Sequence, residues 1–247
     1  MSYEIVPLSL CYYQAEKGYM TYMTNYGQSV IRPFVVWFIR GASKNIIVDT
    51  GIESWDYPTY HPAFKDAQVT HLQTFDQALA SVGITPEQVD IVVQTHLHFD
   101  HVHNLKRCVN AEVLVQKAEY DFAMDPAPFA GIYRPSLWEG ANLHLIEGEY
   151  EIEPGLTLLP APGHAAGGQS LLVETRSGIV AIAGMCTCQD NFYPQAGHPM
   201  VGDDHTLLPG ILLNARDAYE SMIRLRSRAD RILALHDPDI IKQKVIS

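Results

Sequence analysis

The chain has 247 residues, of which 47% are hydrophobic and 18% are charged, which is enough for one large α/β domain. Its 17 basic and 28 acidic side chains give a net charge of −11, which disfavours nucleic acids and anionic membranes because binding to either needs clustered cations. The longest apolar run, Phe34 to Ile39, is interrupted by Arg40 and Gly41 and is too short to cross a bilayer. A small-molecule partner is favoured instead.

Short apolar runs bounded by turn residues predict strands, and periodic runs behind capping residues predict helices. Strands are expected at 35–39, 45–49, 91–93, 111–115, 156–159, 170–174, 179–183 and 231–235. Helices are expected at 74–80, from 85 onward, at 117–123 and at 214–228. Strands and helices alternate, but tight turns join several strand pairs, so we predict mixed sheets covered by helices. No linker or repeat divides the chain, and residues 1–247 are interpreted as a single domain.

A cluster of metal-binding side chains follows the predicted strand at 91–93. In an extended loop His96 and His98 point the same way, and Asp100 and His101 address a second point after the chain turns. Two more histidines, at 164 and 236, also end predicted strands. Imidazole and carboxylate groups are the expected ligands of zinc, and also of iron or manganese. The pattern therefore favours a two-metal hydrolase.

Several motifs follow one another along nearly the whole chain. They are Asp49-Thr50-Gly51, residues 96–101, Gln116 to Tyr120, Pro162-Gly163-His164 with Gly168 to Leu171, and His236-Asp237-Pro238. Together they resemble the metallo-β-lactamase superfamily, and most closely its lactonase branch, the N-acyl-homoserine lactonases and γ-butyrolactone lactonases.

The resemblance implies an αββα four-layer sandwich with the metals at one edge between the sheets. It assigns His96, His98 and His164 to metal 1, and Asp100, His101 and His236 to metal 2. Two zinc ions per chain are expected, with iron or manganese as alternatives.

The chain departs from the family pattern at the residue that normally bridges both metals. Met185 occupies the place of this aspartate, and Cys188 stands where the lactonases tend to carry a tyrosine. A thioether is a poor ligand for a hydrolytic zinc ion. Cys186 or Cys188 could supply a thiolate instead, Asp190 could replace the aspartate, or the site could hold a single metal.

The expected reaction is the opening of a small cyclic ester, a lactone, by a metal-bound hydroxide that attacks the carbonyl. Asp100 is the candidate proton shuttle to the leaving group, and Tyr193 and Tyr133 are candidates for the missing tyrosine. A cyclic amide or imide substrate, an altered or mononuclear site, and a non-hydrolytic iron-binding relative remain alternatives.

Two further expectations concern the surroundings of the protein. Residues 11–26 are rich in Tyr and Met, which suits a loop over the site, ordinary packing or a homodimer surface. The N-terminal residues show no secretory pattern, and the four cysteines (Cys11, Cys108, Cys186 and Cys188) form no C-x-x-C pair. We therefore expect a cytoplasmic protein.

Overall fold

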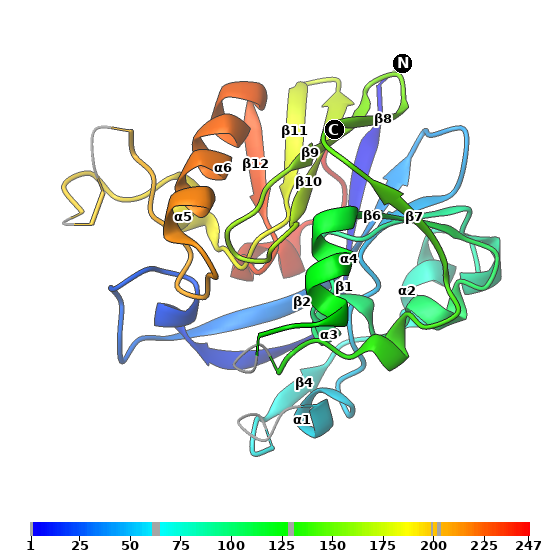
Figure 1. Cartoon of the computed structure of the whole chain (residues 1–247), viewed down its shortest axis with the longest axis horizontal. Helices are drawn as coiled ribbons and strands as arrows, with labels where there is room; N and C mark the ends of the chain where they lie inside the picture. Colours follow the sequence, from blue (N-terminus) through cyan, green and yellow to red (C-terminus); the bar gives the residue numbers. More distant parts are fainter. Residues whose placement is uncertain (1, 61–64, 128–130, 199, 202–203) are drawn as a thin grey trace.

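Two mixed β-sheets pack face to face and carry helices on their outer surfaces (Figure 1). The computed structural model describes residues 2–60, 65–127, 131–198, 200–201 and 204–247. The first sheet has the order β4 (Val69–His71), β1 (Glu4–Glu16), β2 (Ser29–Arg40), β3 (Ile46–Val48), β5 (Ile91–Val93), β6 (Glu112–Gln116) and β7 (Asn142–Ile146). The second has the order β12 (Arg231–Ala234), β11 (Gly178–Ala183), β10 (Gln169–Thr175), β9 (Leu156–Pro160) and β8 (Tyr150–Glu153).

Alternation along the strands explains why the sheets stack. In β2, Val35, Trp37 and Ile39 enter the core between the sheets, whereas Val36 and Phe38 enter the core beneath the helices. Successive side chains of a strand point to opposite faces, so a strand that is apolar throughout needs a cover on both sides.

The helices supply those covers. On the first sheet, α2 (Phe75–Ser81), α3 (Phe99–Val102) and α4 (Lys117–Met124) contribute to the outer core. On the second sheet, α5 (Gln189–Phe192) and α6 (Ala215–Arg228) cover the outer face, and Figure 1 shows α6 on the flank opposite to α2 and α4. The short α1 (Tyr57–Tyr60) joins a separate aromatic cluster. The predicted αββα arrangement is confirmed. Among the described residues, no helix has the length and apolarity that crossing a membrane requires.

The predicted strands and three predicted helices all appear, with ends shifted by at most one residue except in β2, which begins six residues earlier than predicted. Residues 86–88 form only a three-residue 3₁₀ helix, so the helix expected from 85 onward is wrong. Strands β1, β4, β7 and β8 were not predicted from the sequence. Residues 11–16 belong to β1, which pairs with β2 along its length, so residues 11–26 are not a single loop.

The core between the sheets should dominate stability. Leu171 of β10 is fully buried there, so Leu171→Ala should lower the free energy of unfolding by about 2–5 kcal/mol through lost contacts and a residual cavity. The measurement is the urea midpoint at unchanged slope. Leu145→Ala, on exposed β7 surface, is the matched control and should change the free energy by no more than about 0.5 kcal/mol. Equal effects would contradict the assignment of the core.

Candidate metal centre

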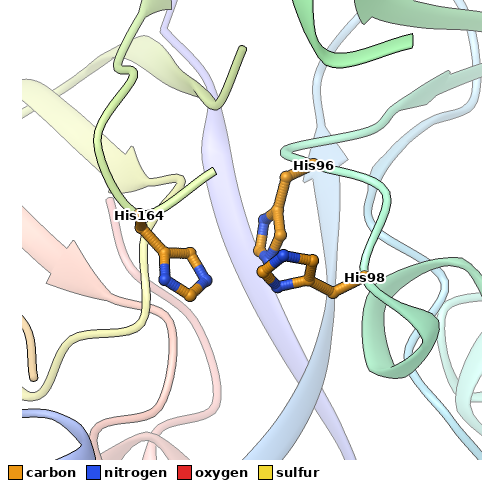
Figure 2. A group of neighbouring side chains, drawn as sticks. All are labelled: His96, His98 and His164. Carbon is orange, nitrogen blue, oxygen red and sulfur yellow. The ribbon is translucent and has the colours of Figure 1, made fainter. Parts of the chain in front are cut away.

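Strand ends from both sheets bring six metal-binding side chains to one edge of the sandwich. The first group contains His96 and His98, from the loop after β5, and His164, from the loop after β9. Figure 2 shows the His164 ring facing the other two from the opposite side. The second group contains Asp100, His101 and His236. Within each group the ligand atoms lie within 4.8 Å of one another, and all six side chains are buried.

Four of the histidines are fixed through Nδ1, which leaves Nε2 for the shared space. The Nδ1 partners are Thr95 Oγ1 for His96 at 2.9 Å, Asp49 Oδ2 for His101 at 2.8 Å, Ile211 O for His164 at 2.7 Å and Pro33 O for His236 at 2.9 Å. An outer hydrogen bond of this kind sets the tautomer and the orientation of a metal-binding ring. Nε2 of His96 and of His101 has no hydrogen-bond partner among the described residues, so the His96 atom is available to a metal ion in the first group.

Asp49 accepts several of the hydrogen bonds that orient the histidine rings. It follows β3 with a φ of 57°, and its carboxylate accepts four hydrogen bonds, from Gln94 Nε2, Thr95 N, Thr95 Oγ1 and His101 Nδ1. Because Thr95 Oγ1 donates to Asp49, it accepts from His96 Nδ1. Asp49 therefore orients His101 directly and His96 through Thr95. In the sequence, Asp49 stood out only as part of the segment Asp49-Thr50-Gly51. Its position directly after a buried strand was the signal that could have identified its role.

Glu119, in α4, connects the two loops of the first group. Its Oε1 accepts from Leu97 N and its Oε2 from Gly167 N, each at 2.9 Å. A side chain at 167 would place Cβ 2.2 Å from Glu119 N, so this close approach requires glycine. Burial raises the pKa of Glu119, and the two backbone hydrogen bonds oppose that rise. Glu119 was also missed from the sequence, where it appeared only as part of the segment from Gln116 to Tyr120.

The electrostatics of the first group suit a metal ion. Burial is the largest cause that lowers the pKa of His96 and His98 far below the ordinary value, and it lowers the pKa of His164 to about 4. The three rings are therefore neutral at pH 7 and keep a free lone pair. Three neutral imidazoles that converge on one point match the donor set of a catalytic zinc site, so this group fits a metal.

The second group does not fit a metal in the same way, because Arg32 lies in it. Arg32 Nη2 is 3.0 Å from Asp100 Oδ2 and 3.0 Å from His236 Nε2. Arg32 comes from β2 and is 7% exposed. Its role was not predicted from the sequence, where the available signal was a charged residue a few positions before the apolar run from Phe34 to Ile39.

The structure does not bring the candidate replacement ligands into either group. Met185 packs in the outer apolar core with Phe192 and Met222. Cys186 is buried beside Arg32, and burial raises the pKa of its thiol while Arg32 opposes the rise. Burial and Asp190 raise the pKa of Cys188 to about 12. Asp190 itself pairs with Lys17 at 2.6 Å.

The two tyrosine candidates lie in different places. Tyr193 is half exposed, and its hydroxyl accepts from Ile232 N in β12. Because Ile232 lies four residues before His236, roughly 13 Å along an extended chain, the structure does not bring Tyr193 to the site, and we correct that expectation. Tyr133 does lie there: its ring meets His98 edge-on at 4.8 Å between centroids. Burial and Glu119 raise the pKa of Tyr133.

An αββα sandwich with an H-x-H-x-D-H loop facing two further histidines defines a class of folds that carry a candidate metal site at one edge of the sandwich. The family model described as the metallo-beta-lactamase superfamily matches residues 33–228, and the chain belongs to this superfamily.

The similar curated proteins are N-acyl homoserine lactonases. One from Bacillus sp. is 31% identical over 164 residues, covering 63% of this chain and 64% of the relative. The lactonase AttM from Azorhizobium caulinodans is 36% identical over 176 residues, covering 64% of this chain and 62% of the relative. The matches thus span less than two thirds of the length of these relatives.

Solved structures share the fold over nearly the full length. A variant of AiiA from B. thuringiensis, with N-decanoyl-L-homoserine bound at its active site, matches with a TM-score of 0.75 and 23% identity, covering 98% of this chain and 96% of that one. An N-acyl homoserine lactone hydrolase with N-hexanoyl-L-homoserine at its catalytic metal centre gives a TM-score of 0.75 and 24% identity, with the same coverage.

The protein should keep its metal ion at pH values below 6.5, the ordinary pKa of histidine. Protons compete with a metal only below the pKa of the ligand, and burial places the pKa of His164 at about 4. Zinc should therefore stay bound as the pH falls past 6.5 and be released as it approaches about 4. Gel filtration followed by elemental analysis at each pH measures the zinc that stays bound. His144→Ala, which removes a surface pair with Glu112, is the control. Half-release near pH 6.5 would contradict the burial argument.

The carboxylate of Asp49 should contribute to metal affinity without contacting the metal. Asp49→Asn places an amide where His101 Nδ1 and Thr95 Oγ1 both donate, so we expect metal affinity to fall roughly 10–100-fold. Competition with a chromophoric chelator measures this affinity. Asp239→Asn, which removes an exposed pair with Lys242, should leave it unchanged; equal losses in the two variants would contradict the role of Asp49.

Proposed function

We propose that this protein is a metal-dependent hydrolase that opens a small cyclic ester, and that N-acyl-homoserine lactones are the substrate class. The observation that carries the proposal is the convergence of His96, His98 and His164 on one point with their rings neutral. The curated relatives, which are N-acyl homoserine lactonases, support the choice of a lactone.

The three histidines would hold the metal, and zinc fits their donor set; iron or manganese would be accepted by the same atoms. When bound, such an ion supplies Lewis acidity, which makes hydroxide available near neutral pH and polarises a carbonyl group. The protein holds the rings in the required tautomer through Thr95 and Ile211.

We assign the proton transfer to Asp100. It is buried, and Arg32 holds its Oδ2 at 3.0 Å, which supports a defined position for its carboxylate. It would accept a proton from the attacking water and return that proton to the alkoxide that leaves when the ring opens. Tyr133, against the His98 ring, is the candidate to donate a hydrogen bond to the substrate.

The segment after β1 supports a substrate with an apolar part. Met20 is buried against Cys186 and Cys188, and Tyr19 O accepts from Ile211 N, the residue whose carbonyl fixes His164. The side chain of Tyr19 is 44% exposed. The exposed aromatic ring of Tyr19, next to the His164 loop, suits contact with an acyl chain.

The test is acid release from N-hexanoyl- and N-decanoyl-homoserine lactone by the zinc-loaded protein, followed with a pH indicator. His98→Ala should lower kcat/KM by at least about 100-fold, because removal of a ligand costs more than the loss of an outer contact. His144→Ala, remote from the site, should retain activity.

Two outcomes would overturn the proposal. Turnover of cyclic amides or imides, with no turnover of lactones, would reassign the substrate class. Iron in the purified protein together with oxygen uptake and no acid release would point to a non-hydrolytic relative.

A further inference from the structure

Arg32 contacts the second group of candidate ligands at the atoms that a metal would need. Its Nη2 lies 3.0 Å from both Asp100 Oδ2 and His236 Nε2. Arginine has only donors, so His236 Nε2 must accept this hydrogen bond, and its Nδ1 accordingly donates to Pro33 O. The single lone pair on Nε2 binds either the guanidinium or a metal ion, not both.

Arg32 is held firmly in this position. Nη1 donates to Tyr13 OH at 3.4 Å, and the guanidinium carbon lies 5.3 Å from the Phe34 ring centroid and 5.9 Å from that of Tyr13. Arg32 and Tyr13 are also register partners in β2 and β1. Aromatic faces and a buried carboxylate favour a fixed cation here, and a divalent ion a few ångströms away would be repelled in this desolvated space.

The rest of the second group offers a second metal fewer ligands than the superfamily pattern does. The superfamily pattern has a bridging aspartate where this chain has Met185, whose side chain packs in the outer core. Cys186, the next residue, is buried beside Arg32 and is not one of the side chains whose ligand atoms gather at this position. Among the described residues, the second group therefore consists of Asp100, His101 and His236 alone.

We propose that the guanidinium of Arg32 takes the place of the second metal ion, so that the protein binds one metal per chain, at His96, His98 and His164. Arg32 is a positioning residue: it supplies the second positive charge of the centre and holds Asp100 and His236 in place. This inference rests on the proposed function in that it concerns the same centre, and it departs from the expectation of two ions per chain.

Metal counting tests this without substrate. The metal-free protein is incubated with excess zinc, freed of loosely bound ions by gel filtration, and analysed for zinc per chain. We expect one ion for the wild-type protein and none for His164→Ala, whereas His236→Ala should keep its single ion. Two ions per chain in the wild type, or loss of the single ion in His236→Ala with retention in His164→Ala, would overturn the proposal.

The role of Arg32 itself is tested by Arg32→Gln and Arg32→Lys. Removal of the charge in Arg32→Gln frees Asp100 and His236, so a second zinc should bind, while Arg32→Lys retains a cation and should stay at one. A folded Arg32→Gln variant that remains at one ion would show that Arg32 does not exclude the metal. If that variant does not fold, the wild type and the two histidine variants still decide the count.

The count separates this inference from the proposed function. One ion per chain with no lactone hydrolysis would overturn the function and leave the metal count standing. Two ions per chain together with lactone hydrolysis would overturn the metal count and leave the proposed function standing.

Discussion

Five imidazole rings and a guanidinium share one buried space, and the need to keep that space from accumulating positive charge governs the rest of the site. Burial lowers the pKa of His96, His98, His164 and His236, so these rings stay neutral. His101 differs: burial lowers its pKa, but Asp100 and Asp49 outweigh that effect and raise it. Asp49 and Asp100 thus lie beside His101, the ring whose pKa is raised. The Nδ1 partners fix which nitrogen of each ring faces inward.

The sandwich makes this arrangement possible because it joins its two sheets at the same edge. Gln169, at the start of β10, donates through Nε2 to Gln94 O and Leu114 O of the first sheet region, at 2.9 and 3.0 Å, and through its backbone to Thr95 O at 2.9 Å. The loop that carries His96 is therefore bonded directly to the sheet that carries His164 and His236. Glu119 adds a second connection between the loops. Ligands far apart in sequence are thus held at a fixed separation.

The sequence predicted the strands that are apolar and bounded by turns, and the six side chains whose types are those of metal ligands. It did not predict β1 or β8, because Tyr, Gln and Glu interrupt their apolar pattern and their burial depends on pairing with distant strands. Residues that act through others were also missed. Asp49 lies in a matching motif and Arg32 in none, but nothing in the local sequence shows that either side chain contacts a histidine; only the fold brings them there.

Arg32 and Met185 are best understood as one change. A divalent ion with a bridging carboxylate contributes a net charge of +2 − 1 = +1 to the second position. An arginine with an uncharged residue in the aspartate's place contributes +1 + 0 = +1. Asp100 and His236 therefore meet the same net charge in either arrangement, and the guanidinium satisfies them with hydrogen bonds of 3.0 Å. An aspartate at 185 aimed into the site would leave the cation of Arg32 between two carboxylates, and a second metal beside Arg32 would leave excess positive charge. Either half of the change alone alters the net charge at this buried position, and on this ground we connect the missing aspartate with the buried arginine.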